Sequence, residues 1–280
     1  MEKSIKKYIL DLVKKAKASC MDMAGVPEDT KNKALILMSD ALIANKQFII
    51  DENRKDLELA KSSNLSNAFI DRLTLNEERI SKMSESLKAL VSLKDVVGEV
   101  IKEWRPSSGF LIKKIRVPIG VIAIIYESRP DVTSDCIGLC FKSGNCVILR
   151  GGSEAINSNK AILKVLLGAI NSLSIPPGAI NLISTTDRQA VWVLLKLSDY
   201  IDLVIPRGGE SLIKEVTKIS RVPVIKHYKG ICHIYVDEEA DLNMAQNICF
   251  NAKVQRPGVC NAMETMLVHK DVAARFLPGM

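Results

Sequence analysis

The sequence contains no pattern typical of a disulfide framework or a membrane span. Its seven cysteines are an odd number and include no CxxC pair, so we expect reduced thiols and a cytoplasmic location. Uninterrupted apolar runs stay short of the roughly 20 residues that a bilayer-spanning helix needs. The segment 1–11 contains lysines, but charge interrupts its helically spaced apolar residues, which predicts an amphipathic helix and not an export signal.

Aromatic residues are scarce, at 5% of the chain, and there are only three histidines. The histidines form no cluster with cysteine or aspartate at metal-ligand spacing, so we expect no bound metal. The net charge of +7 comes from 39 basic and 32 acidic residues that are interspersed, and with so few aromatics it argues against nucleic acid. The excess favours anionic small molecules as ligands, with a mildly basic solvated surface as the alternative.

A length of 280 residues and 47% hydrophobic composition predict a globular protein of one large or two modest domains. Apolar residues at the 3.6-residue period predict helices from the N-terminus to about residue 93. Asn76, followed by Glu77 and Glu78, is expected to open the last of these helices. Beyond them, alternation over Phe110–Val117 predicts a hairpin or an edge strand.

Short apolar segments then alternate with helical patterns, which predicts an α/β fold built on a parallel sheet. The expected strands are Val121–Tyr126, Cys146–Leu149, Ala179–Ile183, Leu203–Ile205, Val222–Ile225 and Cys232–Val236. Open parallel sheets bind ligands at the carboxyl ends of their strands. The turns that follow these strands are therefore candidate binding sites.

Two of these turns contain the same Arg-Gly-Gly sequence. Their residues are Arg150, Gly151, Gly152 and Ser153 in the first, and Arg207, Gly208 and Gly209 in the second. Paired glycines let a backbone approach a ligand closely, an arginine offers a bidentate fork for phosphate, and a helix N-terminus is expected just beyond. Glycine pairs also serve as plain turns, and the GxGxxG fingerprint of ordinary dinucleotide-binding folds is absent.

A third turn, Tyr126–Thr133, follows the first buried strand and places Ser128 and Arg129 at the same edge of the sheet. Asp131 or Thr133 is expected to cap the helix that follows. Capping gives no role to Ser128 and Arg129. These two side chains are therefore candidates for contact with a ligand.

Cys260 lies in Asn251–Ala262, a stretch that contains Pro, Gly and polar residues, whereas the other cysteines lie mostly within apolar runs. The thiolate is the reactive form of cysteine, and the cations nearby in sequence, Arg256 and Lys253, favour it. A thiol displayed in such a turn is typical of a nucleophile. The alternative is that Cys260 merely begins the apolar strand Met263–His269.

In their order along the chain these segments resemble the aldehyde dehydrogenase superfamily and, within it, the γ-glutamyl phosphate reductases. The segments that carry the resemblance are Arg116–Ile122, Tyr126–Pro130, Val147–Gly152, Val204–Gly209, Gly230–Asp237, Asn251–Cys260 and Glu264-Thr265. The resemblance covers essentially the whole chain and implies an aldehyde-dehydrogenase-like α/β fold. It implies an N-terminal helical part of the cofactor domain (1–105), a strand or hairpin toward an oligomerisation ribbon (106–118), an NADP-binding α/β domain (119–240) and the start of a catalytic domain (241–280).

The resemblance also implies an activity, namely NADPH-dependent reduction of L-glutamyl 5-phosphate to L-glutamate 5-semialdehyde and phosphate, in proline biosynthesis. Cys260 would attack the acyl phosphate and form a thioester, which hydride then reduces. The implied oxyanion or substrate contacts are Ser128, Arg129, Asn261 and Arg256, and the two Arg-Gly-Gly turns with Ser153 would bind the cofactor. The backbone N–H of Cys260 is a further oxyanion donor. The implied partners are further copies of the chain and a glutamate 5-kinase that channels the substrate, with no nucleic acid and no membrane.

Two positions depart from the wider superfamily. Typical members supply an Asn side chain to the oxyanion where this chain has Ser128. Hydrolytic members carry a Glu in the segment that corresponds to Val224–Gly230, which here contains no carboxylate. Because a thioester that must be reduced survives better without a hydrolytic base, the absence favours the phosphate-dependent branch. A CoA-acylating aldehyde dehydrogenase also lacks this Glu and is the alternative enzyme.

Cofactor preference follows from the first Arg-Gly-Gly turn. NAD-preferring members of the superfamily often hold the adenosine ribose with a Glu at the position of Ser153. The absence of that carboxylate removes repulsion toward a 2′-phosphate, and Arg150 adds attraction. We therefore expect NADPH.

The chain ends at Met280, soon after the strand expected to follow Cys260, whereas members of the resembled family continue well beyond this point. We therefore expect a C-terminally truncated catalytic domain. One interpretation is the N-terminal portion of an active reductase. The alternative is an inactive nucleotide-binding or subunit-association protein of the same family.

Overall fold

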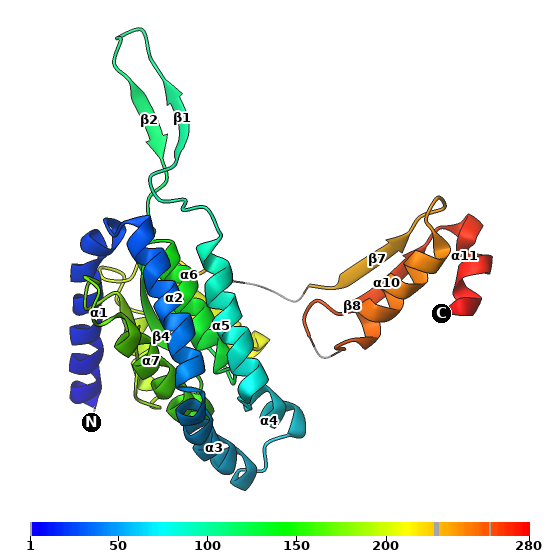
Figure 1. The fold of residues 1–280 in the computed structure, drawn as a ribbon, viewed down its shortest axis with the longest axis horizontal. Coiled ribbons are helices and arrows are strands. Elements are labelled where there is room, and N and C mark those ends of the chain that lie inside the picture. Colours follow the sequence, from blue (N-terminus) through cyan, green and yellow to red (C-terminus); the bar gives the residue numbers. More distant parts are fainter. Residues whose placement is uncertain (1, 227–229, 258) are drawn as a thin grey trace. The chain divides into compact units, whose positions relative to one another are not determined.

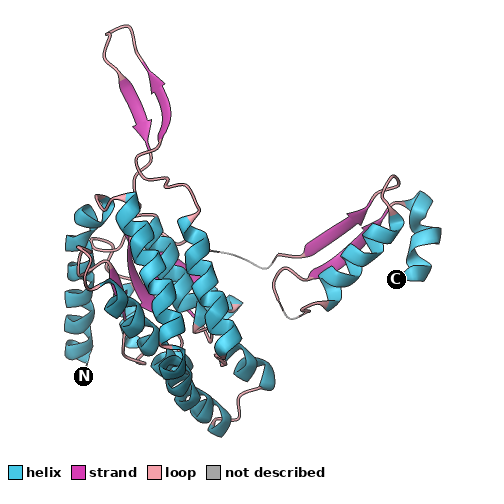
Figure 2. Ribbon diagram, viewed as in Figure 1, coloured by secondary structure: helices cyan, strands magenta, loops and turns pink. Residues whose placement is uncertain are grey.

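The computed structural model describes residues 2–226, 230–257 and 259–280. The chain divides into two compact units, Met1–Lys226 and His227–Met280. Figure 1 traces the order of the elements. Figure 2 shows helices, strands and loops in both units, and a two-stranded hairpin in the first.

The first unit begins with the helices that the 3.6-residue period predicts. They are α1 (Glu2–Ala24), α2 (Glu28–Ala44), α3 (Lys46–Ser62), α4 (Asn67–Leu73) and α5 (Glu77–Val91). The expected start of α5 is confirmed, because the Asn76 side chain accepts a hydrogen bond from the Arg79 N–H at 2.8 Å. Glu77 and Glu78 lie in the first turn of α5, where acidic side chains complement the helix dipole.

A two-stranded antiparallel hairpin follows, made of β1 (Val100–Trp104) and β2 (Ile112–Ile115). Its second strand lies within Phe110–Val117, where the alternation predicted a hairpin or an edge strand, and its first strand is one that the alternation did not reveal. Its apolar side chains are exposed, with Trp104 and Ile115 at 40% and 50%. The hairpin therefore presents apolar surface on a two-stranded ribbon (Figure 1).

The core of the first unit is a four-stranded parallel sheet in the order β5-β4-β3-β6. The strands are β3 (Val121–Tyr126), β4 (Cys146–Arg150), β5 (Ile180–Leu182) and β6 (Leu203–Arg207). The chain runs outward from β3 to β5 and then returns to place β6 on the other side of β3. The order of the strands therefore reverses between β3 and β6, which is where sheets of this type bind ligands.

All residues of β3 and β4 are buried. Parallel sheets need helices against both faces, and the crossover helices supply most of them. They are α6 (Asp131–Lys142), α7 (Ile156–Ile170), α8 (Gln189–Leu194) and α9 (Glu210–Ile219). Helices α6 and α7 pack against each other and the sheet, and α1 packs against α8 and the sheet.

Two of the expected strands are arranged differently from the prediction. Val222–Ile225 contributes only one bridge, between Val204 and Val224, and is not a full strand. Cys232–Val236 is a strand, β7, but it pairs in parallel with β8 (Met263–Val268) and not with the four-stranded sheet. Apolar periodicity identifies a strand but carries no information about its partner.

The second unit contains β7, β8, α10 (Leu242–Val254) and α11 (Lys270–Phe276). A small core of Val236, Ala245, Cys249, Met263 and Phe276 holds these elements together. Its first strand, β7, lies within residues 119–240, the segment for which the resemblance implies an NADP-binding domain, and these domain bounds stay a prediction. Among the helices that the structure describes, none combines the length and apolarity that crossing a membrane requires.

Asp135 on α6 gives a prediction about stability. Burial, together with the nearby carboxylate of Asp131, raises the pKa of Asp135 to about 6, whereas the pKa of an aspartate in an unfolded chain is about 3.9. Because the folded-state pKa is the higher one, stability falls as the pH rises from about 4 to about 6. We predict that Asp135→Asn raises the free energy of unfolding by ~1–2 kcal/mol near neutral pH, after allowance for solvent screening.

Urea denaturation near pH 7.5 and near pH 3.5 measures this effect, and the gain should vanish at the lower pH. Asp199→Asn is the matched control, because the Asp199 side chain is exposed. An equal gain from Asp135→Asn at both pH values would contradict the prediction.

Candidate functional site

The two Arg-Gly-Gly turns and the turn Tyr126–Thr133, which the sequence indicates as candidate binding sites, meet at one edge of the sheet. Arg150 pairs in register with Ile125 of β3, and Arg207 pairs with Tyr126. Since β4 and β6 flank β3, the turns after all three strands lie side by side at its carboxyl end. The structure therefore brings together residues that are far apart in sequence.

A carboxylate joins the turns after β3 and β6. Glu127 Oε2 accepts a hydrogen bond from the Gly209 N–H at 2.8 Å, at the start of α9. A Cβ at Gly208 would lie 2.6 Å from the same carboxyl group, so glycine leaves the space that Glu127 fills. This helix N-terminus, at the point where the strand order reverses, already binds an oxyanion from within the chain.

A second carboxylate joins the turns after β3 and β4. Glu154 Oε1 accepts hydrogen bonds from the Ser128 N–H at 3.0 Å and from the Ser128 hydroxyl at 2.8 Å. Ser128 is buried and has a φ of 33°, in the left-handed region that a non-glycine residue rarely adopts. Glu154 therefore uses both donors of the residue that we expected to face an oxyanion.

Arg150 is buried at the end of β4, and its guanidinium bonds to backbone carbonyls. It donates to the Gly151 carbonyl and, through Nη2, to the Thr186 carbonyl at 3.1 Å. Its Nε is buried and has no partner among the described residues. Burial lowers the pKa of Arg150, with a further lowering from Arg188. The first arginine thus holds the loop before α8 rather than extending into solvent.

Buried side chains next to this edge leave no room for a side chain at Gly151. The Tyr126 hydroxyl is hydrogen-bonded to Thr133 Oγ1 at 2.7 Å, and Thr133 donates to Asn159 Oδ1 at 2.9 Å. Burial raises the pKa of Tyr126, which keeps the phenol neutral. A Cβ at Gly151 would lie 2.1 Å from Asn159 Nδ2 and 3.1 Å from the Tyr126 ring. The glycine is therefore required by this buried network.

The remaining polar residues of the edge face outward. Arg129, Ser153, Arg207 and Gly209 are exposed, whereas Gly152 is buried. A short 3-10 turn, Ser153–Ala155, leads from the first Arg-Gly-Gly turn into α7. Arg129 and Arg207 therefore place two exposed guanidinium groups at the rim, and each can bind an anionic ligand.

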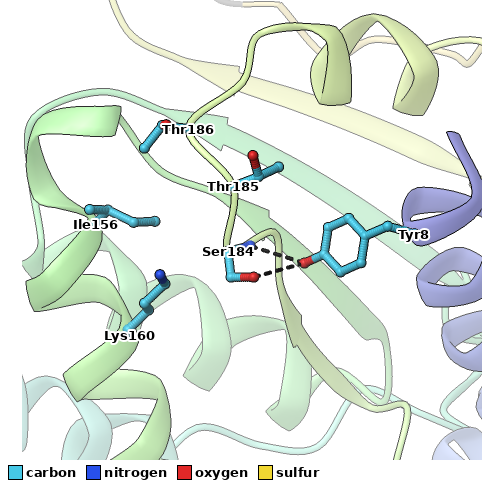
Figure 3. Close-up of a pocket in the computed structure, with 6 residues that line it drawn as sticks. All are labelled: Tyr8, Ile156, Lys160, Ser184, Thr185 and Thr186. Carbon is cyan, nitrogen blue, oxygen red and sulfur yellow. Dashed lines mark hydrogen bonds between the residues drawn. The ribbon is translucent and has the colours of Figure 1, made fainter. Parts of the chain in front are cut away.

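A shallow hollow of about 510 Å³ adjoins the first Arg-Gly-Gly turn. It is lined by Tyr8, Ile156, Lys160, Ser184, Thr185 and Thr186. Figure 3 shows α7 on one side and the 184–186 loop on the other, with the Tyr8 hydroxyl bonded to Ser184. No sequence motif marked this hollow, because its residues come from three separate segments.

In the second unit, Cys260 lies in the turn between α10 and β8, as the sequence predicts, and it is exposed. Its carbonyl accepts a hydrogen bond from the Cys232 thiol at 3.3 Å. Asn261 and Arg256 are exposed in the same turn, while Lys253 Nζ donates to the Met263 carbonyl at 3.1 Å. The turn therefore presents the thiol together with an amide and a guanidinium. Gly258 of this stretch, and residues 227–229 of Val224–Gly230, lie outside the described residues.

Comparison with known proteins identifies the fold. A model of the aldehyde dehydrogenase family matches residues 3–280. The chain belongs to the aldehyde dehydrogenase family. The α/β fold that the resemblance implied is thereby confirmed.

Within this family the chain is similar to γ-glutamyl phosphate reductases. It is 52% identical to the one from Thermodesulfovibrio yellowstonii over 99% of the chain and 66% of that relative's length. It is 55% identical to the one from Caldanaerobacter subterraneus subsp. tengcongensis over 95% of the chain and 64% of the relative. A crystal structure of γ-glutamyl phosphate reductase from Thermotoga maritima matches with a TM-score of 0.88 and 43% identity, over 96% of the chain and 65% of that structure. This chain thus spans slightly less than two thirds of the length of these relatives.

Sequence reasoning missed Glu127 and Glu154, the two carboxylates that join the turns of this aldehyde dehydrogenase-family chain. Both are adjacent to residues that we singled out, Ser128 and Ser153. A carboxylate in a turn that follows a buried strand, at the carboxyl edge of the sheet, is a signal that could have found them. What sequence could not provide was the partner, because each bond joins turns at least 26 residues apart.

Replacement of Gly151 tests the packing behind the edge. We predict that Gly151→Ala lowers the free energy of unfolding by ~2–3 kcal/mol, because the new methyl group overlaps Asn159 and Tyr126. Gly209→Ala is the control, because its Cβ would meet only Glu127 Oε2, at 3.8 Å. Denaturant unfolding measures both variants, and equal losses would contradict the role of Gly151.

Alkylation tests the exposure of Cys260. All seven cysteines are free, and Cys260 alone is classed as exposed. We predict that a limiting amount of iodoacetamide labels Cys260 first, as peptide mass spectrometry would show. Preferential labelling of Cys20 or Cys136, which are half-buried, would contradict the prediction.

Proposed function

We propose that the chain carries the cofactor domain and the nucleophile of an NADPH-dependent oxidoreductase that reduces L-glutamyl 5-phosphate to L-glutamate 5-semialdehyde and phosphate, in proline biosynthesis. The observation that carries the proposal is the exposed thiol of Cys260 in the turn between α10 and β8. Its support is the identity of 50–55% to chains named γ-glutamyl phosphate reductase.

Cys260 acts as the nucleophile. Its thiolate forms a C–S bond to the acyl carbon, and the C–O bond to phosphate breaks, so that phosphate leaves and a thioester remains. The backbone N–H of Cys260 and the exposed amide of Asn261 are donors in the same turn for the oxyanion that develops. Collapse of the reduced adduct releases the aldehyde and returns Cys260 to the thiolate.

The nicotinamide cofactor, when bound, supplies the hydride for that reduction. The described residues fit such a group, because the Gly209 N–H already binds the Glu127 carboxylate where a diphosphate would lie. Arg207, Gly208 and Gly209 would hold the diphosphate, and Arg150, Gly151, Gly152 and Ser153 border the adenosine end. Glu127 must turn away from Gly209 to admit a second anion.

The absence of a hydrolytic base from one segment of the sequence supports a reductive fate for the thioester. The segment Val224–Gly230 contains no Asp or Glu in its sequence. A thioester therefore meets no hydrolytic base from this segment, in keeping with a reductive rather than hydrolytic fate. The exposed apolar hairpin β1–β2 supports assembly of the protein into homo-oligomers. We assign the protein to the cytoplasm.

The assay is phosphate-dependent reduction of NADP⁺ with glutamate 5-semialdehyde as substrate. We predict that Cys260→Ser lowers the rate by ~10³-fold or more, because a serine hydroxyl is a far weaker nucleophile at neutral pH than a thiolate. Cys20→Ser is the control in the first unit and keeps the rate. An unchanged rate in Cys260→Ser would contradict the assignment of Cys260 as the nucleophile. A reaction that requires CoA in place of phosphate would favour the CoA-acylating alternative.

A further inference from the structure

A hydrogen bond links the hollow beside the first Arg-Gly-Gly turn to the end of β4. Arg150, the last residue of β4, donates through Nη2 to the carbonyl of Thr186, and Thr186 lines the hollow. In nucleotide-binding sheets the end of the strand next to the first one lies beside the adenosine ribose. The hollow therefore borders the place where the 2′ position of the ribose would lie.

The lining of the hollow suits a phosphate group. Its six residues include no Asp or Glu and provide one ammonium group and several hydroxyls. Figure 3 shows the Lys160 side chain rising from α7 into the space between Ile156 and Ser184. Among the residues that the structure describes, Lys160 is exposed and makes no ion pair or hydrogen bond.

The nearest carboxylates in sequence are held elsewhere. Glu154, just before α7, is bonded to Ser128. Asp187, just after the 184–186 loop, accepts a hydrogen bond from the Gln189 N–H at 2.8 Å. Thr185 Oγ1 accepts from the Asp187 N–H, which leaves its own hydroxyl proton to donate. A dianionic group in the hollow would thus meet donors and a free cation.

Arg150 is less able to bind a phosphate in this position than its sequence context indicates. Two of its nitrogens already donate to the Gly151 and Thr186 carbonyls, and the side chain is buried. A bidentate grip on phosphate needs two nitrogens on one edge of the guanidinium to be free. Lys160 offers three donors that no described residue uses.

We propose that Lys160 is the residue that selects NADPH over NADH, by binding the 2′-phosphate of the adenosine in this hollow together with the hydroxyls of Thr185 and Thr186. The inference rests on the proposed function, since it assumes a nicotinamide dinucleotide at the carboxyl edge. It assigns the 2′-phosphate to α7 and the 184–186 loop, and leaves Arg150 the role of holding that loop in place.

The test is isothermal titration calorimetry of the full 280-residue chain with two probes, adenosine 2′,5′-bisphosphate and adenosine 5′-monophosphate. The wild-type chain should bind the bisphosphate about tenfold more tightly or better. Lys160→Met should lose about tenfold of the affinity for the bisphosphate and keep its affinity for the monophosphate, since the loss is that of one charge-assisted contact. Lys160→Arg, which keeps the charge, should retain most of the preference.

Lys164→Met is the matched control. Lys164 lies one turn further along α7 and carries the same charge, but its ammonium lies over the Phe48 ring at 5.3 Å. It should leave both affinities unchanged, which separates a local contact from a change in overall charge.

The outcomes separate this inference from the proposed function. If the wild-type chain prefers the bisphosphate and Lys160→Met keeps that preference, the 2′-phosphate is bound elsewhere and the inference is overturned while the NADPH assignment stands. Equal loss in Lys160→Met and Lys164→Met would also overturn it. If the wild-type chain binds neither probe, the nucleotide site itself is refuted, and the role of Lys160 fails with it.

Discussion

Strands β3 and β4 are buried along their whole length, and the arrangement of the first unit follows from this burial. A parallel sheet with apolar residues on both faces requires helices on both faces, and α6 with α7, and α1 with α8, pack against it. Only the ends of the strands remain available for polar chemistry. At the carboxyl end, the return of the chain to β6 places turns from distant segments next to one another.

Internal carboxylates occupy this edge. Glu127 accepts from the Gly209 N–H, and Glu154 accepts from the N–H and hydroxyl of Ser128. These bonds hold the turns in fixed relative positions, so little ordering remains for a ligand to impose. They also use donors that an anionic ligand would need. A ligand that binds there replaces one charge-assisted hydrogen bond with another. Because these donors are already bonded to a carboxylate and not to water, the desolvation cost of binding is lower.

Much of the fold was predictable because its signals are local. Continuous apolar runs identified β3 and β4, the 3.6-residue period identified the N-terminal helices, and Asn76 marked the start of α5. A turn at Cys260 was predictable for the same reason, since Pro257, Gly258 and polar residues precede it, but only the structure decided that Cys260 lies before the following strand and not in it. The partner of β7 was not, because strand pairing depends on contacts between distant segments.

The candidate site shows the same difference between features set by local sequence and features set by contacts between distant segments. The sequence by itself determined which residue types stand at the ends of the strands: the Arg-Gly-Gly turns, Ser128 and the thiol of Cys260. Only the tertiary structure decided what each side chain contacts. It placed Arg150 on backbone carbonyls, Glu154 on Ser128, and Lys160 in a hollow formed with Tyr8 and the 184–186 loop. Turn chemistry acts over a few residues, whereas a hydrogen-bond partner is set by whichever distant segment the packed core brings within about 3 Å.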